Sequence, residues 1–357
     1  MKPWSKSRRI FLRSLLRPEA IVLLACYGFH LGCANRTNHH VVLSDHGLIS
    51  PRAQENIRSV VASVVGVAAM FDYRLDFFRY ETVNGQFIPD AISPTGYRLA
   101  KVANPITTAK KIQKVHGGGL IIYRDDRNTV ILTTEHILSS PDTIRTYYRD
   151  AAGNETKVLS SRAVKKRTTH HVIDQINQLL PAEVLHTDPR ADLGLVMVTT
   201  SQTLGLTFPY SIAYKSEVKW GDVAFVFGFP REIKQLSVGL ISPSPYPGVF
   251  SLDVVGRFGF SGGPVFVIRP GGDLELAGII RGVPVNKLQY IAPPPEILPG
   301  QNLQADDLER TTAQEIDMIE YGTVYALGVE KIGRFLKDSV PILEKKGIYL
   351  SRHLLPK

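Results

Sequence analysis

Residues 259–264 read Gly-Phe-Ser-Gly-Gly-Pro and run directly into the apolar stretch 264–268. Glycines permit the unusual backbone angles of a tight turn and let another chain approach the backbone closely. A serine on such a turn exposes its hydroxyl, and the neighbouring backbone N–H groups stay free to hold an oxyanion, as acyl transfer requires. The stretch therefore predicts a nucleophilic Ser261 next to a strand. The alternative is a glycine-rich hairpin that carries a surface serine.

Short apolar and β-branched runs recur on both sides of this turn, separated by polar, Gly- or Pro-containing segments. They lie at residues 60–71, 120–123, 129–133, 192–199, 222–229, 235–241, 264–268, 274–280 and 323–327. Such spacing is typical of an all-β sandwich or a pair of barrels. A boundary near residues 201–216 divides the runs into two halves. Helical patterns are expected at about residues 164–180 and 330–340, and one short helix can start at Ser50-Pro51.

A serine hydroxyl needs a base, and two segments upstream offer a base and an acid. Thr133-Thr134-Glu135-His136 closes the expected strand 129–133, so His136 can project from a strand-to-loop junction. Asp192 directly precedes the residues of an apolar strand, a position from which an acid can accept the imidazole N–H and fix its tautomer. Asp188 competes for this role, but no apolar strand follows it directly. Taken singly, each of these residues also fits a structural role.

The order His136, Asp192, Ser261 on a chain with two β halves resembles the chymotrypsin/trypsin-like serine proteases. The resemblance is carried by three motifs, Thr133–His136 (family T-A-A-H), Asp192–Leu195 (D-x-A-L) and Gly259–Pro264 (G-[DN]-S-G-G-P). Residues 117–122 and 226–230 are similar to the glycine-led strand and the x-x-G-x-P element of exported bacterial HtrA-type proteases. The resemblance implies an all-β fold of two packed antiparallel β-barrels with a C-terminal helix.

The same resemblance implies the roles of individual residues in a serine endopeptidase. Ser261 would be the nucleophile, His136 the general base and Asp192 the residue that orients His136. The backbone N–H groups of Gly259 and Ser261 would form the oxyanion hole. The strand 276–282, through Ile280, Arg281 and Gly282, would pair with the backbone of a protein or peptide substrate. Such an enzyme needs no metal and no organic cofactor, and no nucleic-acid partner is expected.

Two departures from the family pattern bear on activity. Phe260 replaces the usual Asp or Asn before the nucleophile, and Glu135 stands beside His136, where a carboxylate favours the imidazolium and weakens the base. Because the oxyanion donors are backbone groups, Phe260 need not abolish activity. The departures keep open a catalytically inactive domain that binds peptides. An envelope adhesion or scaffold protein, with the triad order a coincidence, is the remaining alternative.

The N-terminal region predicts export. Residues 1–19 hold six Lys or Arg and one Glu, and an apolar run follows at residues 20–32, which is the pattern of a signal peptide. This region accounts for most of the formal charge, since +4 of the total +9 remains without it. Cys33 is the expected lipidation site of an envelope lipoprotein anchored in a membrane. Cys26, simple cleavage and an uncleaved anchor are the alternatives.

The expected organisation is therefore a signal peptide at 1–32, a tether at 33–58, a protease domain at 59–345 and a tail at 346–357. Within the domain, barrel one covers about 59–200, barrel two about 217–328 and the terminal helix about 330–340. A Pro-rich insertion at 293–317 is expected to form an irregular loop. Few residues follow the helix, so no PDZ module is expected. With 44% hydrophobic and 21% charged residues, the composition excludes wholesale disorder and a polytopic membrane protein.

Overall fold

The computed structural model describes residues 50–150, 154–200, 204–214, 218–244, 246–292 and 312–356. The expected signal peptide and the candidate lipidation sites Cys26 and Cys33 lie outside the described residues. The expected tether is described only from Ser50 onward. In the part of the chain that the structure describes, no helix is long and apolar enough to cross a membrane.

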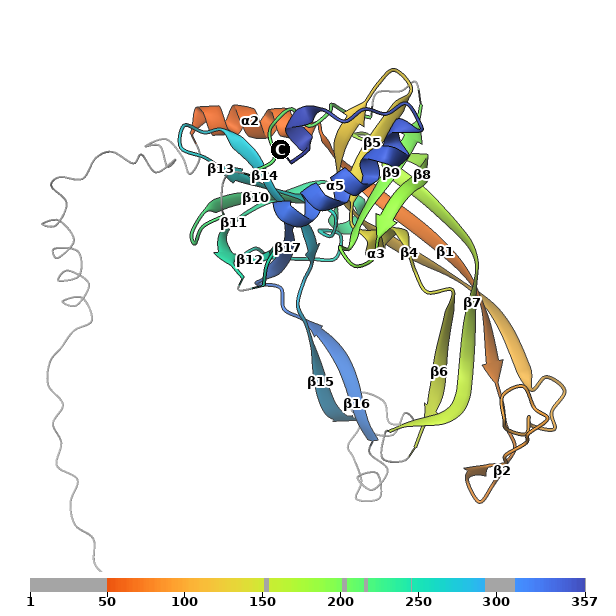
Figure 1. Cartoon of the computed structure of the whole chain (residues 1–357). Helices are drawn as coiled ribbons and strands as arrows, with labels where there is room; N and C mark the ends of the chain where they lie inside the picture. Colours follow the sequence, from red (N-terminus) through yellow and green to blue (C-terminus); the bar gives the residue numbers. More distant parts are fainter. Residues whose placement is uncertain are drawn as a thin grey trace, which may run out of the picture. The chain divides into compact units, whose positions relative to one another are not determined.

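The first half of the chain forms a ring of antiparallel strands (Figure 1). The ring runs in the order β1 (Val64–Phe78), β4 (Ile106–Arg124), β5 (Asn128–Thr133), β9 (Leu193–Thr199), β8 (Leu179–Asp188) and β7 (Glu155–Ile173). A second pairing between β1 and β7 closes it, and β6 (Thr143–Arg149) adds to the other edge of β7. Val65, Ile121, Ile131 and Val196 fill its interior. This ring is the expected first barrel.

The second half forms a closed barrel of six strands. Its order is β10 (Val223–Gly228), β11 (Gln235–Pro243), β12 (Val249–Leu252), β17 (Val324–Gly328), β14 (Leu274–Gly282) and β13 (Pro264–Ile268). Phe250, Val265 and Ile280 are fully or almost fully buried inside it. The prediction of an all-β fold with two antiparallel barrels and a C-terminal helix is confirmed.

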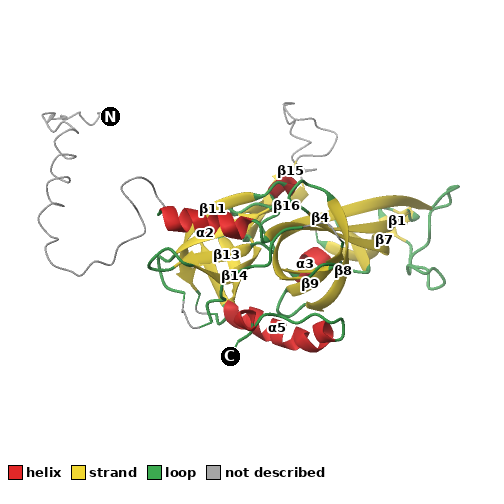
Figure 2. Cartoon of the chain, turned by 90° about the horizontal axis from the view of Figure 1, so that it is seen from above, coloured by secondary structure: helices red, strands yellow, loops and turns green. Residues whose placement is uncertain are grey.

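Helices cover the barrels at three places (Figure 2). α2 (Pro51–Val61) begins where the sequence predicts, because the Ser50 hydroxyl accepts a hydrogen bond from the Ala53 N–H at 3.2 Å and Pro51 occupies the first turn. The short α3 (Glu135–Leu138) contacts β1, β4, β8 and β9 of the first barrel. The C-terminal α5 (Val329–Glu344) is longer than the sequence predicts and buries Ile332, Phe335 and Leu336. Two single turns of 3-10 helix are η1 (Pro230–Glu232) and η2 (Arg352–Leu354).

The prediction of a helix at residues 164–180 is wrong. This stretch belongs to β7 and β8, which pair with each other from His170↔Ala182 to Ile173↔Leu179. β7 also pairs with β1 and β6, so its backbone groups are satisfied by neighbouring strands. One of its basic residues is held by the fold, since the Lys165 ammonium donates to the Ser140 carbonyl at 2.6 Å and pairs with Asp142. The strand expected from residue 60 likewise begins only at Val64, after α2 ends.

The irregular loop expected at residues 293–317 is wrong in its last part. Residues 312–319 form β16 (Thr312–Ile319), which pairs with β15 (Val285–Ala292) in a two-stranded ribbon next to β14. The rest of the expected loop, 293–311, lies outside the described residues. Leu288 and Ile316 pair across this ribbon and are about half exposed, so the ribbon leaves apolar side chains in solvent.

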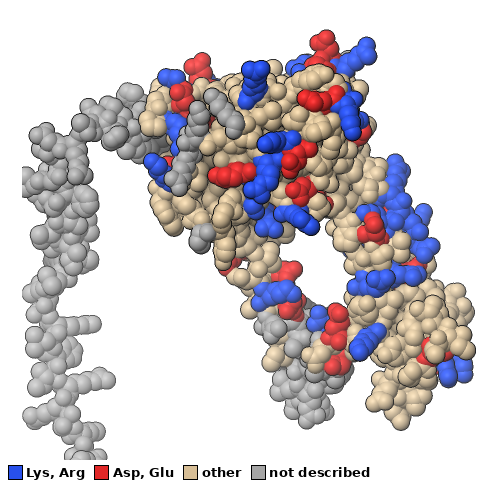
Figure 3. Space-filling view, in the orientation of Figure 1, with Lys and Arg blue, Asp and Glu red and all other residues tan. Residues whose placement is uncertain are grey.

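An arm of β1, β4 and β7 extends beyond the first ring and has its own small core. Phe78, Tyr80 and Val158 are buried there, beside the two-residue strands β2 (Thr82–Val83) and β3 (Gln86–Phe87). The Asp76 carboxylate is buried in the arm and pairs with Arg74 at 3.2 Å and Arg162 at 3.1 Å. Figure 3 shows Lys and Arg side chains gathered along the side of the arm.

Candidate active site

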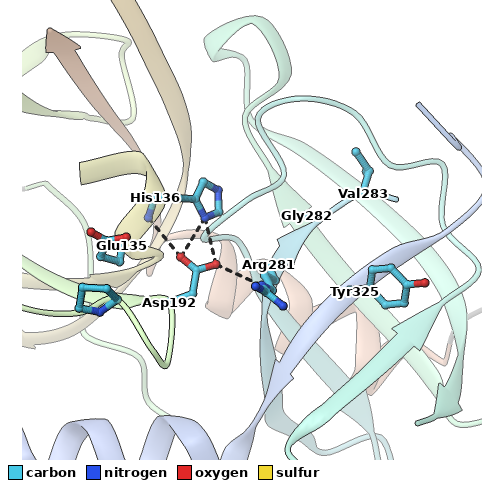
Figure 4. Close-up of a pocket in the computed structure, with 8 residues that line it drawn as sticks. Glu135, His136, Asp192, Arg281, Gly282, Val283 and Tyr325 are labelled. Atoms are coloured by element: carbon cyan, nitrogen blue, oxygen red, sulfur yellow. Dashed lines mark hydrogen bonds and ion pairs between the residues drawn. The ribbon is translucent and has the colours of Figure 1, made fainter. Parts of the chain in front are cut away.

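His136 and Asp192 form a close pair at one end of the first barrel (Figure 4). His136 Nδ1 lies 3.0 and 3.1 Å from the two carboxylate oxygens of Asp192, and the backbone N–H of His136 donates to Asp192 Oδ1 at 3.1 Å. The Asp192 side chain is 13% exposed. A carboxylate so placed holds the imidazole in one orientation and favours the tautomer that carries its proton on Nδ1.

Local structure explains why these two side chains meet. Thr134 precedes the short helix α3, so the chain turns directly after β5 and presents His136. Ile137 and Leu138 anchor α3 in the core, and the Leu138 carbonyl lies 2.8 Å from His170 Nε2. Asp192 takes a left-handed backbone conformation with φ 56° immediately before β9. The competing Asp188 instead closes its own turn, accepting the N–H groups of Arg190 and Ala191 at 2.8 and 3.2 Å.

Ser261 lies on the glycine-rich loop before β13 of the second barrel, where this loop contacts the first barrel. The Gly118 N–H donates to the Ser261 carbonyl at 2.7 Å, and Thr133 Oγ1 donates to the Gly118 carbonyl at 2.8 Å. A Cβ atom at Gly117 would collide with the Ser261 carbonyl oxygen, and one at Gly262, where φ is 76°, would collide with Gly118. The glycines of both segments are therefore required for the loop to approach the first barrel.

The predicted oxyanion donors are unpaired. Among the described residues, neither the Gly259 N–H nor the Ser261 N–H donates a hydrogen bond. Gly259 has φ 103°, and its carbonyl is turned toward the Phe229 N–H, which donates to it at 2.8 Å. This backbone conformation, which favours glycine, leaves two N–H groups on either side of Phe260 available for an anion.

Phe260 does not line the cleft. Its side chain is 1% exposed and packs in the core of the second barrel with Val226, Val265 and Ile280. Gly228 lies directly beneath its ring, since a Cβ atom there would come within 2.6 Å of Phe260 Cγ. The residue that replaces the family's Asp or Asn thus fixes the loop by apolar burial.

Arg281 links the serine to the His–Asp pair. The Ser261 hydroxyl donates to the Arg281 carbonyl at 3.2 Å, while Arg281 Nε lies 3.4 Å from Asp192 Oδ2. Among the described contacts, Ser261 makes no hydrogen bond to His136. The sequence singled out Arg281 for its backbone, and no signal in the sequence indicated that its guanidinium would reach Asp192.

The strand predicted to pair with substrate, residues 276–282 of β14, lies beside the Ser261 loop. Gly262 N–H donates to the Ile280 carbonyl and Ile280 N–H to the Gly263 carbonyl, both at 2.8 Å, so β14 is tied to the serine loop. A pocket of about 540 Å³ is lined by Glu135, His136, Pro189, Asp192, Arg281, Gly282, Val283 and Tyr325. The Glu135 carboxylate in this pocket is engaged by the Ser139 hydroxyl. No group of three or more metal-binding side chains occurs among the described residues.

Comparison with known proteins identifies the class. Residues 117–271, which include all three candidate catalytic residues, match the family model of the trypsin-like peptidase domain. The predicted resemblance to the chymotrypsin/trypsin-like proteases is thereby confirmed for this segment of the chain. Among solved structures, an HtrA-type protease, AlgW with a decapeptide, aligns at 13% identity with a TM-score of 0.42, over 82% of this chain and 67% of that chain. No curated protein matches the sequence.

Proposed function

We propose that the protein is a serine endopeptidase that cleaves proteins through Ser261, His136 and Asp192. The observation that carries the proposal is the His136–Asp192 pair, with both carboxylate oxygens within 3.1 Å of Nδ1, next to a serine on a glycine loop. The two unpaired N–H groups of that loop add the donors that acyl transfer needs.

Catalysis then begins with a rotation of the Ser261 side chain. The hydroxyl leaves the Arg281 carbonyl and turns toward His136 Nε2, which accepts its proton as the oxygen attacks the scissile carbonyl. The N–H groups of Gly259 and Ser261 hold the oxyanion, and Asp192 stabilises the imidazolium. His136 passes the proton to the leaving amine, and water releases the acyl group from Ser261 by the reverse sequence.

Substrate backbone is expected to pair with the end of β14. Ile280 is buried and tied to the serine loop, whereas Arg281 is 59% exposed and Gly282 lines the pocket at His136. An extended peptide added to this edge would place its carbonyl group at Ser261. The cell envelope, reached through the N-terminal signal and a lipid on Cys33, is the proposed location of the enzyme and its protein substrates.

One observation favours a second candidate, a catalytically inactive domain that binds peptides. The Ser261 hydroxyl is hydrogen-bonded to the Arg281 carbonyl and not to its base. If that arrangement persists with substrate bound, the domain binds peptides without hydrolysing them.

Hydrolysis of a fluorescently labelled unfolded protein by the full chain separates the two candidates. The endopeptidase predicts cleavage that falls by at least about 10⁴-fold in Ser261→Ala and in His136→Ala. The binding module predicts no cleavage by any of the three proteins and equal affinity of the parent and Ser261→Ala for the labelled protein.

A further inference from the structure

A second pocket, of about 700 Å³, adjoins the Ser261 loop and shares no lining residue with the pocket at His136. Phe258 and Arg257 line it immediately before Gly259, and the Arg257 carbonyl accepts the Phe260 N–H at 3.2 Å. Pro230, the first residue of η1 after β10, also lines the pocket. It lies against the serine loop, since a Cβ atom at Gly259 would come within 2.9 Å of the Pro230 Cα atom. A polypeptide held at Ser261 therefore passes close to this second pocket.

His116 connects the pocket to the first barrel. It lines the pocket and directly precedes Gly117, the glycine packed against the Ser261 carbonyl. His116 Nε2 is buried and has no hydrogen-bond partner within the described part of the chain. The pocket thus spans the junction of the two barrels, as the candidate catalytic residues do.

The charged residues that line this pocket all have one sign. Its lining includes Arg231, Lys234 and Arg257 and no Asp or Glu. The adjacent Glu232 is paired with Lys114. Among the described residues, neither Arg231 nor Arg257 forms a salt bridge. The Lys234 ammonium donates to two neutral oxygens, the Val61 carbonyl at 2.9 Å and Gln175 Oε1 at 2.6 Å. Three cationic residues therefore line this pocket, and its lining holds no carboxylate to balance them.

The walls between these cations are apolar. Ile233 and Phe258 line the pocket and are 64% and 69% exposed, and Tyr321 lies beside them at 56%. Exposed apolar side chains bordered by cations suit a ligand with an anionic head on a short aliphatic stem, since burial of the stem and charge pairing then act together. Aspartate and glutamate side chains of a polypeptide have this chemistry.

We propose that this pocket binds acidic side chains of the polypeptide substrate, within a few residues of the scissile bond. That the bound polypeptide is a substrate rests on the proposed function. The binding of acidic side chains is inferred independently, from the cationic lining by Arg231, Lys234 and Arg257. Acidic segments are then selected over neutral ones of the same shape, and the selection weakens with salt because exposed charge pairs are screened.

A binding measurement tests the pocket without relying on turnover. The full chain with Ser261→Ala is titrated with fluorescein-labelled decapeptides that carry Glu or the isosteric Gln at successive positions, and anisotropy gives Kd. We expect Kd to be at least about 10-fold lower for the Glu peptide at one or two positions, with the difference lost in the added Arg231→Gln/Arg257→Gln variant. Arg334→Gln/Lys337→Gln, which removes two exposed cations from α5, is the matched control and should keep the preference.

The outcomes separate this inference from the proposed function. Equal Kd values for Glu and Gln peptides at every position, or a preference that survives Arg231→Gln/Arg257→Gln, overturn the inference whether or not the parent cleaves. If Ser261→Ala prefers the Glu peptide while the folded parent cleaves none of them, the endopeptidase proposal fails and the acid-binding pocket stands. Circular dichroism of each variant confirms that the fold is kept.

Discussion

Asp192 holds His136 by three contacts while its own backbone lies in the left-handed region. Its carboxylate accepts the His136 backbone N–H and reaches Nδ1 with both oxygens, and its φ is 56°. A non-glycine residue rarely adopts this conformation, and Asp and Asn tolerate it best. Because strain of this kind persists where surrounding structure enforces it, the backbone at Asp192 is part of how the imidazole is positioned.

Asp192→Asn tests this positioning with little disturbance of the fold. Asn tolerates the left-handed conformation and keeps the shape of the side chain, but its amide favours the wrong imidazole tautomer. We expect peptide hydrolysis to fall by about 10⁴-fold with an unchanged melting temperature. Asp188→Asn, which changes the acid of the neighbouring turn, should retain most activity; the reverse ranking of these two variants would place the catalytic acid at Asp188.

Gly117→Ala tests the contact between the first barrel and the serine loop. Its Cβ atom would overlap the Ser261 carbonyl oxygen and the Ile137 side chain, so the loop must move away from His136. We expect a stability loss of about 1–3 kcal/mol and a loss of activity larger than the stability loss explains. Gly322→Ala, with nothing within 4 Å of the added atom, is the control. Full activity in a folded Gly117→Ala protein would show that the contact does not position Ser261.

The buried Asp76 predicts acid sensitivity of the arm. Burial alone would raise the pKa of Asp76, but hydrogen bonds from Arg162 and Thr108 and the charge of Arg74 outweigh it and hold the pKa below its ordinary value. An acid with a lowered pKa stabilises the fold above its unfolded pKa of about 4, and this stabilisation is lost as pH falls through the lower folded pKa.

Asp76→Asn should therefore lower stability at pH 7 by about 1–3 kcal/mol and flatten its fall below pH 4. Thermal unfolding of the parent and the variant between pH 7 and 3 measures both effects. Asp72→Asn, on the same strand, is the control. Parallel pH profiles for the parent and Asp76→Asn would rule out a role of this carboxylate in acid unfolding.

Lys234 predicts an effect of the same sign, a rise of stability with pH, in an alkaline window. Burial lowers the pKa of Lys234 to about 8. The unfolded chain, with a Lys pKa of about 10.4, then binds more protons than the native chain from pH 8 upward, so this residue makes stability rise with pH in that window. Lys234→Met should remove that contribution, which unfolding in urea at pH 7.5 and 10 detects. An identical pH dependence in parent and variant would contradict it.

Local sequence motifs predicted the candidate site, whereas the pairing of strands distant in sequence was not predicted. The segments around His136, Asp192 and Ser261 each carry their chemistry within a few residues, and chain order then indicated how they combine. Residues 164–180 have a helical pattern because strand alternation there is masked by basic residues, and the partners of one of them, Ser140 and Asp142, lie elsewhere in the chain. The ribbon of β15 and β16 joins segments separated by residues 293–311, so neither strand signals its partner locally.

Two side-chain contacts at the site, those of Phe260 and Arg281, also could not be predicted from the sequence. The burial of Phe260 depends on the cavity left by Gly228 in a neighbouring strand. The reach of Arg281 to Asp192 depends on how β14 of one barrel faces the acid of the other. Both are products of the packed fold, so no single-chain pattern near either residue could have indicated them.

Fluorophosphonate labelling of the full chain, with the modified residue mapped by mass spectrometry, tests the assembled nucleophile most directly. The probe reacts with an activated serine and requires no knowledge of the substrate. We predict one label per chain, on Ser261, absent in Ser261→Ala and strongly slowed in His136→Ala. A folded parent that takes no label, or a label that persists on another serine in Ser261→Ala, would contradict a catalytic role for Ser261.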